Sequence, residues 1–149
     1  MKEITNEKEA AKYLNIPEND ISCFYKYENE NWGYIDKYGY DHLFKFINDK
    51  WIEISKNVKA LCICIYTNGD WQYTDEFNYC HLMREVDGKY IELSKDIKAV
   101  DIWSYDNGYW EYYDEDGYCH LYNFINGKNI RLREKNKKQQ QLYSNGSNN

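Results

Sequence analysis

Short runs of alternating hydrophobic and polar residues fill residues 21–132, and turn-forming residues separate them. In the middle of the chain the runs are ALCICIY, WQYTD, YCHLMREV and KYIELS, with TNGD, EFN and DG between them. Alternation of this kind, bounded by Gly, Asn and Asp, is typical of strands in antiparallel hairpins. The pattern therefore predicts four short strands joined by tight turns, which is a β-meander.

This four-strand pattern occurs three times. A block of 39 residues repeats without insertion, as marked by Trp32, Trp71 and Trp110 and by His42, His81 and His120. A fixed period in the range of about 20 to 50 residues indicates a repeat architecture, in which each unit buries its apolar surface against its neighbours. We therefore predict an all-β fold of three 39-residue four-stranded antiparallel repeats.

Three arrangements of such repeats are open. A β-trefoil is favoured, because it contains three repeats of about forty residues and closes within one chain. The second arrangement is three propeller blades. Three blades rarely close alone, so this version predicts a homodimer that completes a six-bladed ring. The third is an open stack of hairpins.

The turns predict which side chains share a face of each repeat. Asn68-Gly69, Asn107-Gly108 and Asp87-Gly88 indicate two-residue type I′ turns, which need positive φ at both central residues. With these turns and a three-residue second loop, one face is aromatic and the other aliphatic. In the second repeat the aromatic face holds Tyr66, Trp71, Tyr73, Asp75, Tyr79 and His81, and the aliphatic face holds Leu61, Ile63, Ile65, Leu82, Val86, Ile91 and Leu93.

Sequence patterning divides the chain into three parts. Residues 1–20 form a predicted N-terminal helical extension, with an N-cap at Thr5 or Asn6 and an end before Pro17. Residues 21–132 form the predicted threefold-repeat β domain. Residues 133–149 lack an apolar pattern, so we expect a disordered polar tail.

Charge and composition narrow the function classes. The 149-residue chain carries a formal net charge of −6, which disfavours nucleic acid as a partner because such binding needs clustered Lys and Arg. No apolar run suits a membrane span, and the N-terminus lacks the apolar core of a secretory signal. We expect no membrane association and a cytoplasmic location. Five cysteines then fit reduced thiols rather than disulfides.

Aromatic and polar residues that repeat together form the candidate ligand-binding set. The set is Trp32, Trp71, Trp110, Tyr34, Tyr73, Tyr112, Asp36, Asp75, Asp114, His42, His81 and His120. An aromatic ring can stack on the face of a sugar, a carboxylate can bind its hydroxyls, and three weak sites gain by multivalency. The alternative interpretation is that Trp and Tyr pack the repeats together while Asp and His form a hydrogen-bonded pair that closes each hairpin.

Catalytic and metal-binding motifs are not found in the sequence. There is no Gly-rich phosphate loop, nucleophile elbow or His-Glu-x-x-His motif, so we expect no enzyme activity. A site made from the three histidines would require them at the axial ends of their strands, and the pattern places them inside. We expect no metal and no cofactor.

Parts of each repeat resemble a known family of repeats. The segments NWGYIDKYGYD, GDWQYTDEFNY and NGYWEYYDEDGY, followed by VDGKYIEL and INGKNIRL, resemble WG repeats and the aromatic hairpin repeats of cell-wall-binding modules. The resemblance covers about a third of each copy. It implies a binding role.

Two functions follow from these patterns. The first is a non-catalytic binding module that uses the repeated Trp/Tyr/Asp/His face, with carbohydrate as the ligand. The second is a small acidic intracellular protein of the inhibitor or immunity type, whose surface meets a basic protein partner.

Overall fold

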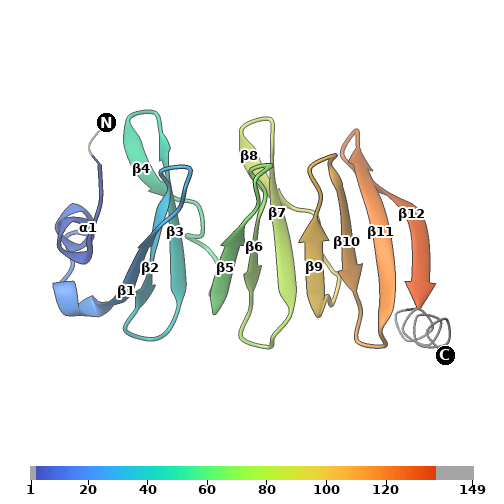
Figure 1. Ribbon diagram of the computed structural model, residues 1–149, viewed down its shortest axis with the longest axis horizontal. Coiled ribbons are helices and arrows are strands. Elements are labelled where there is room, and N and C mark those ends of the chain that lie inside the picture. Colours follow the sequence, from blue (N-terminus) through green and yellow to red (C-terminus); the bar gives the residue numbers. More distant parts are fainter. Residues whose placement is uncertain (1–2, 137–149) are drawn as a thin grey trace, which may run out of the picture. The chain divides into compact units, whose positions relative to one another are not determined.

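Three four-stranded antiparallel sheets follow one another along the chain (Figure 1). The structure is a computed structural model and describes residues 3–136. Each repeat supplies one sheet with its strands in chain order. The sheets comprise β1 (Ile21–Lys26), β2 (Trp32–Asp36), β3 (Asp41–Ile47) and β4 (Lys50–Glu53); β5 (Cys62–Ile65), β6 (Trp71–Thr74), β7 (Cys80–Val86) and β8 (Lys89–Glu92); and β9 (Asp101–Ser104), β10 (Tyr109–Tyr113), β11 (Tyr118–Ile125) and β12 (Lys128–Asn136).

The predicted all-β fold with one four-stranded meander per repeat is confirmed, whereas the trefoil is not. Within residues 3–136 each sheet contains the strands of a single repeat. Outside the sheets, isolated bridges join Asp41 to Ala60 and Cys80 to Ala99. Tight turns between all four strands make each strand pair with its chain neighbour, which is the pairing expected of a blade or a stacked hairpin. The chain divides after Ile63 into two compact units.

The turn between the third and fourth strands has the predicted type I′ geometry. Asp87 and Gly88 both have positive φ, at 52° and 80°. The equivalent turn of the first repeat is Asn48-Asp49, where Asp49 holds φ at 62° without being a glycine.

The turn between the first and second strands differs from the prediction. Gly69 and Gly108 have positive φ there, at 92° and 93°, as does Glu30 at the equivalent position of the first repeat, but Asn68 and Asn107 do not. Tyr66 N–H donates to Asp70 O, so three residues rather than two lie in the loop.

The additional residue exchanges the two faces of the first strand. Tyr66 leaves the aromatic face, where the sequence had placed it, and lies towards the third sheet. Ile63 and Ile65, which were predicted on the aliphatic face, lie on the aromatic face instead, as their equivalents Ile102 and Ser104 do in the third repeat.

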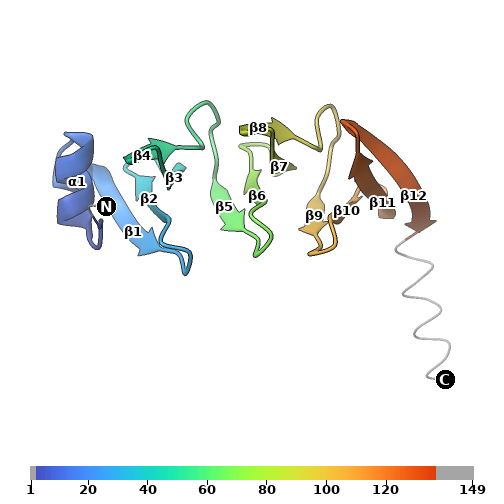
Figure 2. The same cartoon turned by 90° about the horizontal axis from the view of Figure 1, so that it is seen from above.

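The short N-terminal helix covers the aromatic face of the first sheet. Helix α1 (Glu7–Leu14) begins at Asn6, whose side chain accepts a hydrogen bond from Glu9 N–H. A 3₁₀ turn (Glu18–Asp20) then leads into β1. Ala10 and Ala11 are buried in one cluster with Trp32 and Phe44, and Figure 2 shows α1 beside β1. The helix therefore caps the first repeat.

The second and third sheets share one core within the C-terminal unit. The aliphatic face of the second sheet supplies Leu82 and Leu93, and the aromatic face of the third supplies Ile102, Trp110 and Tyr112. Burial at such an interface contributes roughly 25 cal/mol per Å² of apolar surface. Unlike faces of consecutive repeats therefore hold this unit together.

The last strand continues past the predicted end of the β domain at residue 132. Strand β12 pairs with β11 up to Asn136, so residues 133–136 belong to the sheet. The rest of the predicted polar tail, residues 137–149, lies outside the described residues. Among residues 3–136, no helix has the length and apolar character to cross a membrane.

Replacing Asp49 by Gly should stabilise the protein. The substitution removes the cost of a left-handed backbone at a residue with a side chain. We expect the free energy of unfolding to increase by about 0.5–1 kcal/mol. Urea denaturation measures this change. The matched substitution Gly88→Asp should act in the opposite direction, and a loss of stability in the Asp49→Gly variant would contradict the turn assignment.

Candidate functional site

The three tryptophans of the candidate set lie in the core of their repeats. Trp32, Trp71 and Trp110 are 0%, 1% and 0% exposed. Trp32 stacks on Phe44 with ring centroids 4.2 Å apart, and Trp110 stacks on a tyrosine of the next strand. Loss of a buried aromatic ring of this size typically costs about 3–5 kcal/mol. Their repetition is therefore accounted for by packing.

The candidate tyrosines and histidines stack in pairs across β2/β3 and its equivalents. Tyr73 lies opposite His81, as predicted, with ring centroids 4.5 Å apart and an interplanar angle of 12°. The first and third repeats have the same stack, between Tyr34 and His42 and between Tyr112 and His120. Burial, together with nearby carboxylates, raises the pKa of Tyr73 to about 12 and keeps its phenol neutral.

The candidate aspartates join each second hairpin to its histidine. Asp75 Oδ1 accepts hydrogen bonds from the backbone N–H groups of Phe77 and Tyr79, and Oδ2 lies 2.7 Å from Nε2 of His81. Asp36 and Asp114 make the same contacts in their repeats. Burial works against the shift, but these hydrogen bonds hold the pKa of Asp75 below its ordinary value.

The histidine then connects this hairpin to the fourth strand. In the second repeat, Nδ1 of His81 lies 3.0 Å from Glu92 Oε2. Ser94 Oγ donates to the same carboxylate and accepts a hydrogen bond from Leu82 N–H. The hydrogen bond with Glu92 raises the pKa of His81, burial opposes it, and Asp75 adds to the rise. The first repeat holds an identical set around His42.

The third repeat breaks this network. Arg131 and Arg133 stand where the first two repeats have Glu and Ser. Among residues 3–136, Nδ1 of His120 is buried without a hydrogen-bond partner. The repeat that ends the described sheets therefore lacks the link between hairpin and fourth strand.

Taken together, the twelve candidate residues form one framework in each repeat, with the Trp and Tyr rings buried and the aspartates partly buried. Each aspartate and histidine is already paired inside its own repeat, and each tryptophan is covered. The prediction that these residues bind a ligand stays a prediction, and their geometry corresponds to the packing alternative. Within residues 3–136, no group of three or more His, Cys, Asp and Glu side chains could hold a metal ion.

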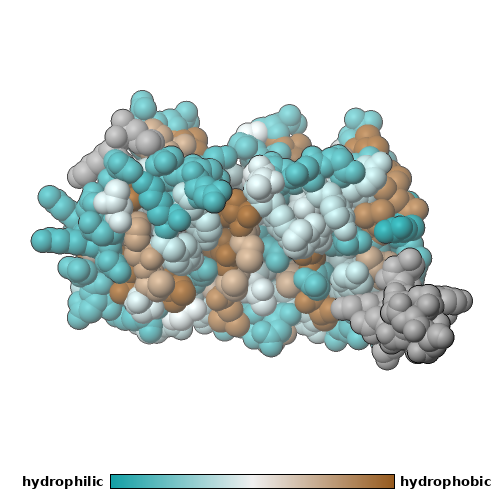
Figure 3. Space-filling view, in the orientation of Figure 1, coloured by the Kyte–Doolittle hydropathy of each residue, from teal (hydrophilic) through white to brown (hydrophobic). Residues whose placement is uncertain are grey.

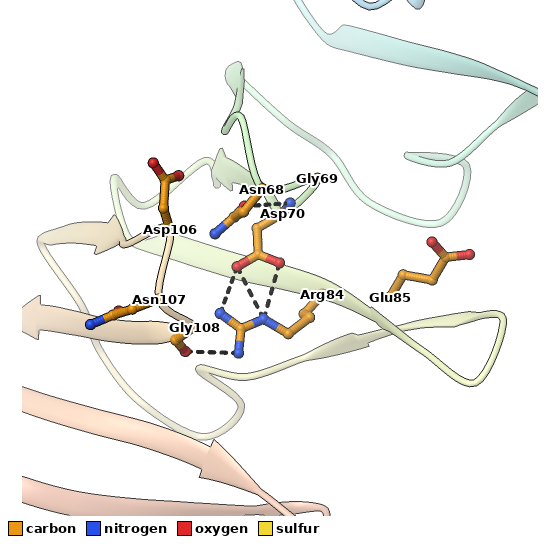
Figure 4. A pocket seen from close by; sticks show the side chains of 8 residues that line it. All are labelled: Asn68, Gly69, Asp70, Arg84, Glu85, Asp106, Asn107 and Gly108. Carbon is orange, nitrogen blue, oxygen red and sulfur yellow. Dashed lines mark hydrogen bonds and ion pairs between the residues drawn. The ribbon is translucent and has the colours of Figure 1, made fainter.

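A hollow in the C-terminal unit contains a charged pair that the sequence reasoning missed. Arg84 makes a bidentate contact with Asp70, at 2.8 Å from Nη2 to Oδ2, and donates from Nη1 to the backbone oxygen of Gly108 (Figure 4). Ser104 Oγ donates to the same Asp70 carboxylate at 2.6 Å. Asp70 is 3% exposed. The pair therefore joins the second sheet to the third.

Departure from the repeat is the signal that could have revealed this contact. Asp70 stands where the other copies have Asn31 and Tyr109, and Arg84 where they have Lys45 and Asn123. A buried, bidentate ion pair fixes relative position rather than adding much net stability. Its donors and acceptors bind each other, so we assign this hollow a structural role.

A second buried carboxyl lies in the N-terminal unit. Asp41 is 6% exposed, and its Oδ2 accepts a hydrogen bond from Ile63 N–H at 3.0 Å. Burial raises the pKa of Asp41 to about 6, with that hydrogen bond acting in the opposite direction. The other repeats have Cys80 and Cys119 at this position. The carboxyl therefore closes the end of a strand.

Exposed aromatic, apolar and acidic side chains gather at one end of the C-terminal unit. We call this set the acidic tip surface; it comprises Phe77, Val100, Asp101, Glu115, Asp116 and Tyr118. Phe77 is 79% exposed, Val100 47% and Tyr118 39%. Figure 3 shows hydrophobic groups, in brown, among hydrophilic ones in the lower part of the face that is drawn.

Backbone contacts place these residues beside one another. Val100 N–H donates to Tyr113 O, and Asp101 pairs with Tyr113 across β9 and β10. Tyr113 leads directly into the hairpin that carries Glu115 and Asp116. Cys80 Sγ lies 3.7 Å from Val100 O, which brings the hairpin of Phe77 to the same end. The surface therefore combines two hairpin tips.

Comparison with known proteins adds no family. No protein-family model matches the chain, and a search of curated proteins finds no match. The resemblance to WG and cell-wall-binding repeats stays a prediction, so the function rests on the geometry of the surface.

Replacing His81 by Gln should cost more stability at low pH than at high pH. The folded pKa of His81 lies above its ordinary value, so its contribution is complete below about pH 6.5 and is lost as pH rises through the folded pKa. We expect a cost of about 1–3 kcal/mol at pH 6 and less at pH 8.5. Thermal and urea unfolding across this range measure the difference.

The control for this prediction is Glu92→Gln, which removes the first partner of the imidazolium. In that background the pH dependence of the His81→Gln cost should shrink. A cost that does not change between pH 6 and pH 8.5 would show that the ion pairs contribute nothing.

Proposed function

We propose that this protein is a non-catalytic interaction module whose acidic tip surface binds a basic protein partner in the cytoplasm. One observation carries the proposal. Residues 99–127 contain six Asp and Glu and no Lys or Arg, and the exposed aromatic and apolar groups of the third repeat lie among them. All five cysteines are free thiols, which fits a reducing compartment.

Electrostatics supports a basic partner. Carboxylates on adjacent turns of one surface add their potentials, which steers an oppositely charged protein and raises its association rate. Salt screens such exposed charges over about 8 Å at physiological ionic strength. Binding should therefore weaken as salt rises.

Exposed aromatic and apolar groups supply binding energy that charge alone does not. Binding energy at protein interfaces concentrates in a few aromatic anchors surrounded by polar residues. Phe77 and Tyr118, with Val100 between the two hairpins, have this composition and lie near the exposed carboxylates of Glu115 and Asp116. The tip surface thus offers both steering and anchoring.

A sugar-binding function has less support. Stacking on a sugar needs an aromatic face open to solvent, and the repeated tryptophans have none. The aspartates that would bind hydroxyls already accept hydrogen bonds from their own turns. The carbohydrate hypothesis would require the repeats to open.

A peptide-display selection on the full chain tests the proposal. Selected peptides should be rich in Lys and Arg and should bind more weakly as salt rises. The double variant Glu115→Lys/Asp116→Lys should lose at least about tenfold in affinity, because two attractive charges become repulsive. Fluorescence anisotropy with the selected peptide measures the dissociation constant.

The matched control is Glu28→Lys/Glu85→Lys, which makes the same change in net charge at exposed acids outside the tip surface. It should retain most of the affinity. Equal losses in the two double variants would mean that net charge alone attracts the peptide. Selection of neutral peptides would also contradict the proposal.

A further inference from the structure

The third sheet has an outer apolar face that no residue among 3–136 covers. Its members are Leu121, Ile125, Ile130 and Leu132, which we call the terminal face. Ile125 and Ile130 are each 46% exposed and Leu132 is 44% exposed. Asn123 pairs with Ile130 across β11 and β12, so strand alternation places Leu121 and Ile130 on one side. The aromatic face of this sheet is on the other side, inside the core.

The same face of the preceding sheet shows what these residues do when covered. Leu82, Ile91 and Leu93 are the repeat equivalents of Leu121, Ile130 and Leu132. In the second sheet they pack against the third, and Leu82 and Leu93 are 0% and 3% exposed. The third repeat thus retains three apolar residues at the positions that, in the second repeat, pack against the next sheet.

Solubility normally requires a polar outer face on the last repeat of a stack. The N-terminal end meets this need with α1, which covers the aromatic face of the first sheet. Because that face is occupied, the terminal face of one chain cannot stack on the first sheet of another. Head-to-tail growth is therefore blocked, and the remaining arrangement for two copies is terminal face against terminal face with twofold symmetry.

Charge on the terminal face is complementary to itself under such symmetry. Glu111, on β10, pairs with Leu121 across the sheet and lies towards the β9 side. Arg133 and Lys128, on β12, pair with Leu121 and Ile125 and lie on the opposite side. A twofold axis parallel to the strands places the β12 side of one protomer over the β10 side of its partner. Arg133 of each protomer then lies opposite Glu111 of the other, because both pair with Leu121 and so have the same height along the strands.

We propose that the chain forms a homodimer through Leu121, Ile125, Ile130 and Leu132 of its third sheet, with Arg133 of one protomer facing Glu111 of its partner. A four-stranded face spans only about 15–20 Å across its strands, which is small for a stable interface. The dimer is therefore reversible, with a dissociation constant in the micromolar range. The inference goes beyond the proposed function, since it uses a different surface from the acidic tip.

Sedimentation equilibrium of the full chain from about 2 to 300 μM tests the dimer. The mass should rise reversibly from the 18.1 kDa of one chain towards twice that value. Ile130→Lys should weaken association at least about tenfold, because it places a charge inside the apolar contact. A mass that stays at 18.1 kDa over the whole range would overturn the proposal.

Ile52→Lys is the matched control, because Ile52 has the same place in the first repeat and is 41% exposed. It should leave the dissociation constant unchanged; equal weakening by both variants would place the contact elsewhere. Arg133→Glu should also weaken the dimer, and combining it with Glu111→Lys should restore part of the loss. Failure of this rescue would contradict the facing of Arg133 and Glu111.

Removal of residues 137–149 distinguishes a second copy from the chain's own C-terminal segment. If a second copy is the occupant, the truncated chain dimerises as the full chain does. If the full chain is monomeric and only the truncated chain dimerises, the segment covers the face and the proposal is wrong. Far-UV circular dichroism confirms that each variant is folded.

Discussion

A single carboxylate at each second hairpin connects the local and tertiary structure of its repeat. One oxygen of Asp75 accepts two backbone N–H groups and sets the turn, while the other binds His81. Because that histidine also stacks on Tyr73 and binds Glu92, the turn, the strand pair and the fourth strand become one unit. Hydrogen bonds to charged groups contribute more than neutral ones, so this arrangement can define a repeat of only about forty residues. The unlike faces of the repeat can then stack.

Residues that repeat and residues that do not repeat have different roles in this chain. Repeated residues build the framework, because every copy needs the same turn, stack and buried tryptophan. Departures from the repeat mark particular tasks: Asp70 and Arg84 fix two sheets together, and Asp116, where the other copies have Tyr38 and Phe77, adds a carboxylate to an exposed tip. We accordingly propose that the binding surface lies on the third repeat and on the neighbouring hairpin of the second.

Much of the fold could be predicted from the sequence, because hydrophobic alternation and turn residues are local properties. The four-stranded meander, a helix cap at Thr5 or Asn6, of which the structure uses Asn6, and the pairing of Tyr73 with His81 all follow from them. Faces were assigned wrongly along the first strand of the repeat, where an unforeseen third loop residue exchanged the faces of Tyr66 and of Ile63 and Ile65. The trefoil prediction relied on the number and length of the repeats, and these do not determine how the sheets associate. The sequence alone could not decide whether the tryptophans are buried, since residues repeat with the same period whether they pack the core or bind a ligand.

The central claim is that the repeated aromatic residues are framework rather than binding surface. Tryptophan emission with acrylamide quenching, with and without a panel of simple sugars, tests it most directly. Trp103, at 57% exposure, should be the quenchable tryptophan, so the Trp103→Phe variant should show blue emission that acrylamide barely quenches and sugars do not change. Quenching of the remaining tryptophans in that variant, with protection by a sugar, would contradict the account and return the ligand to the repeated face.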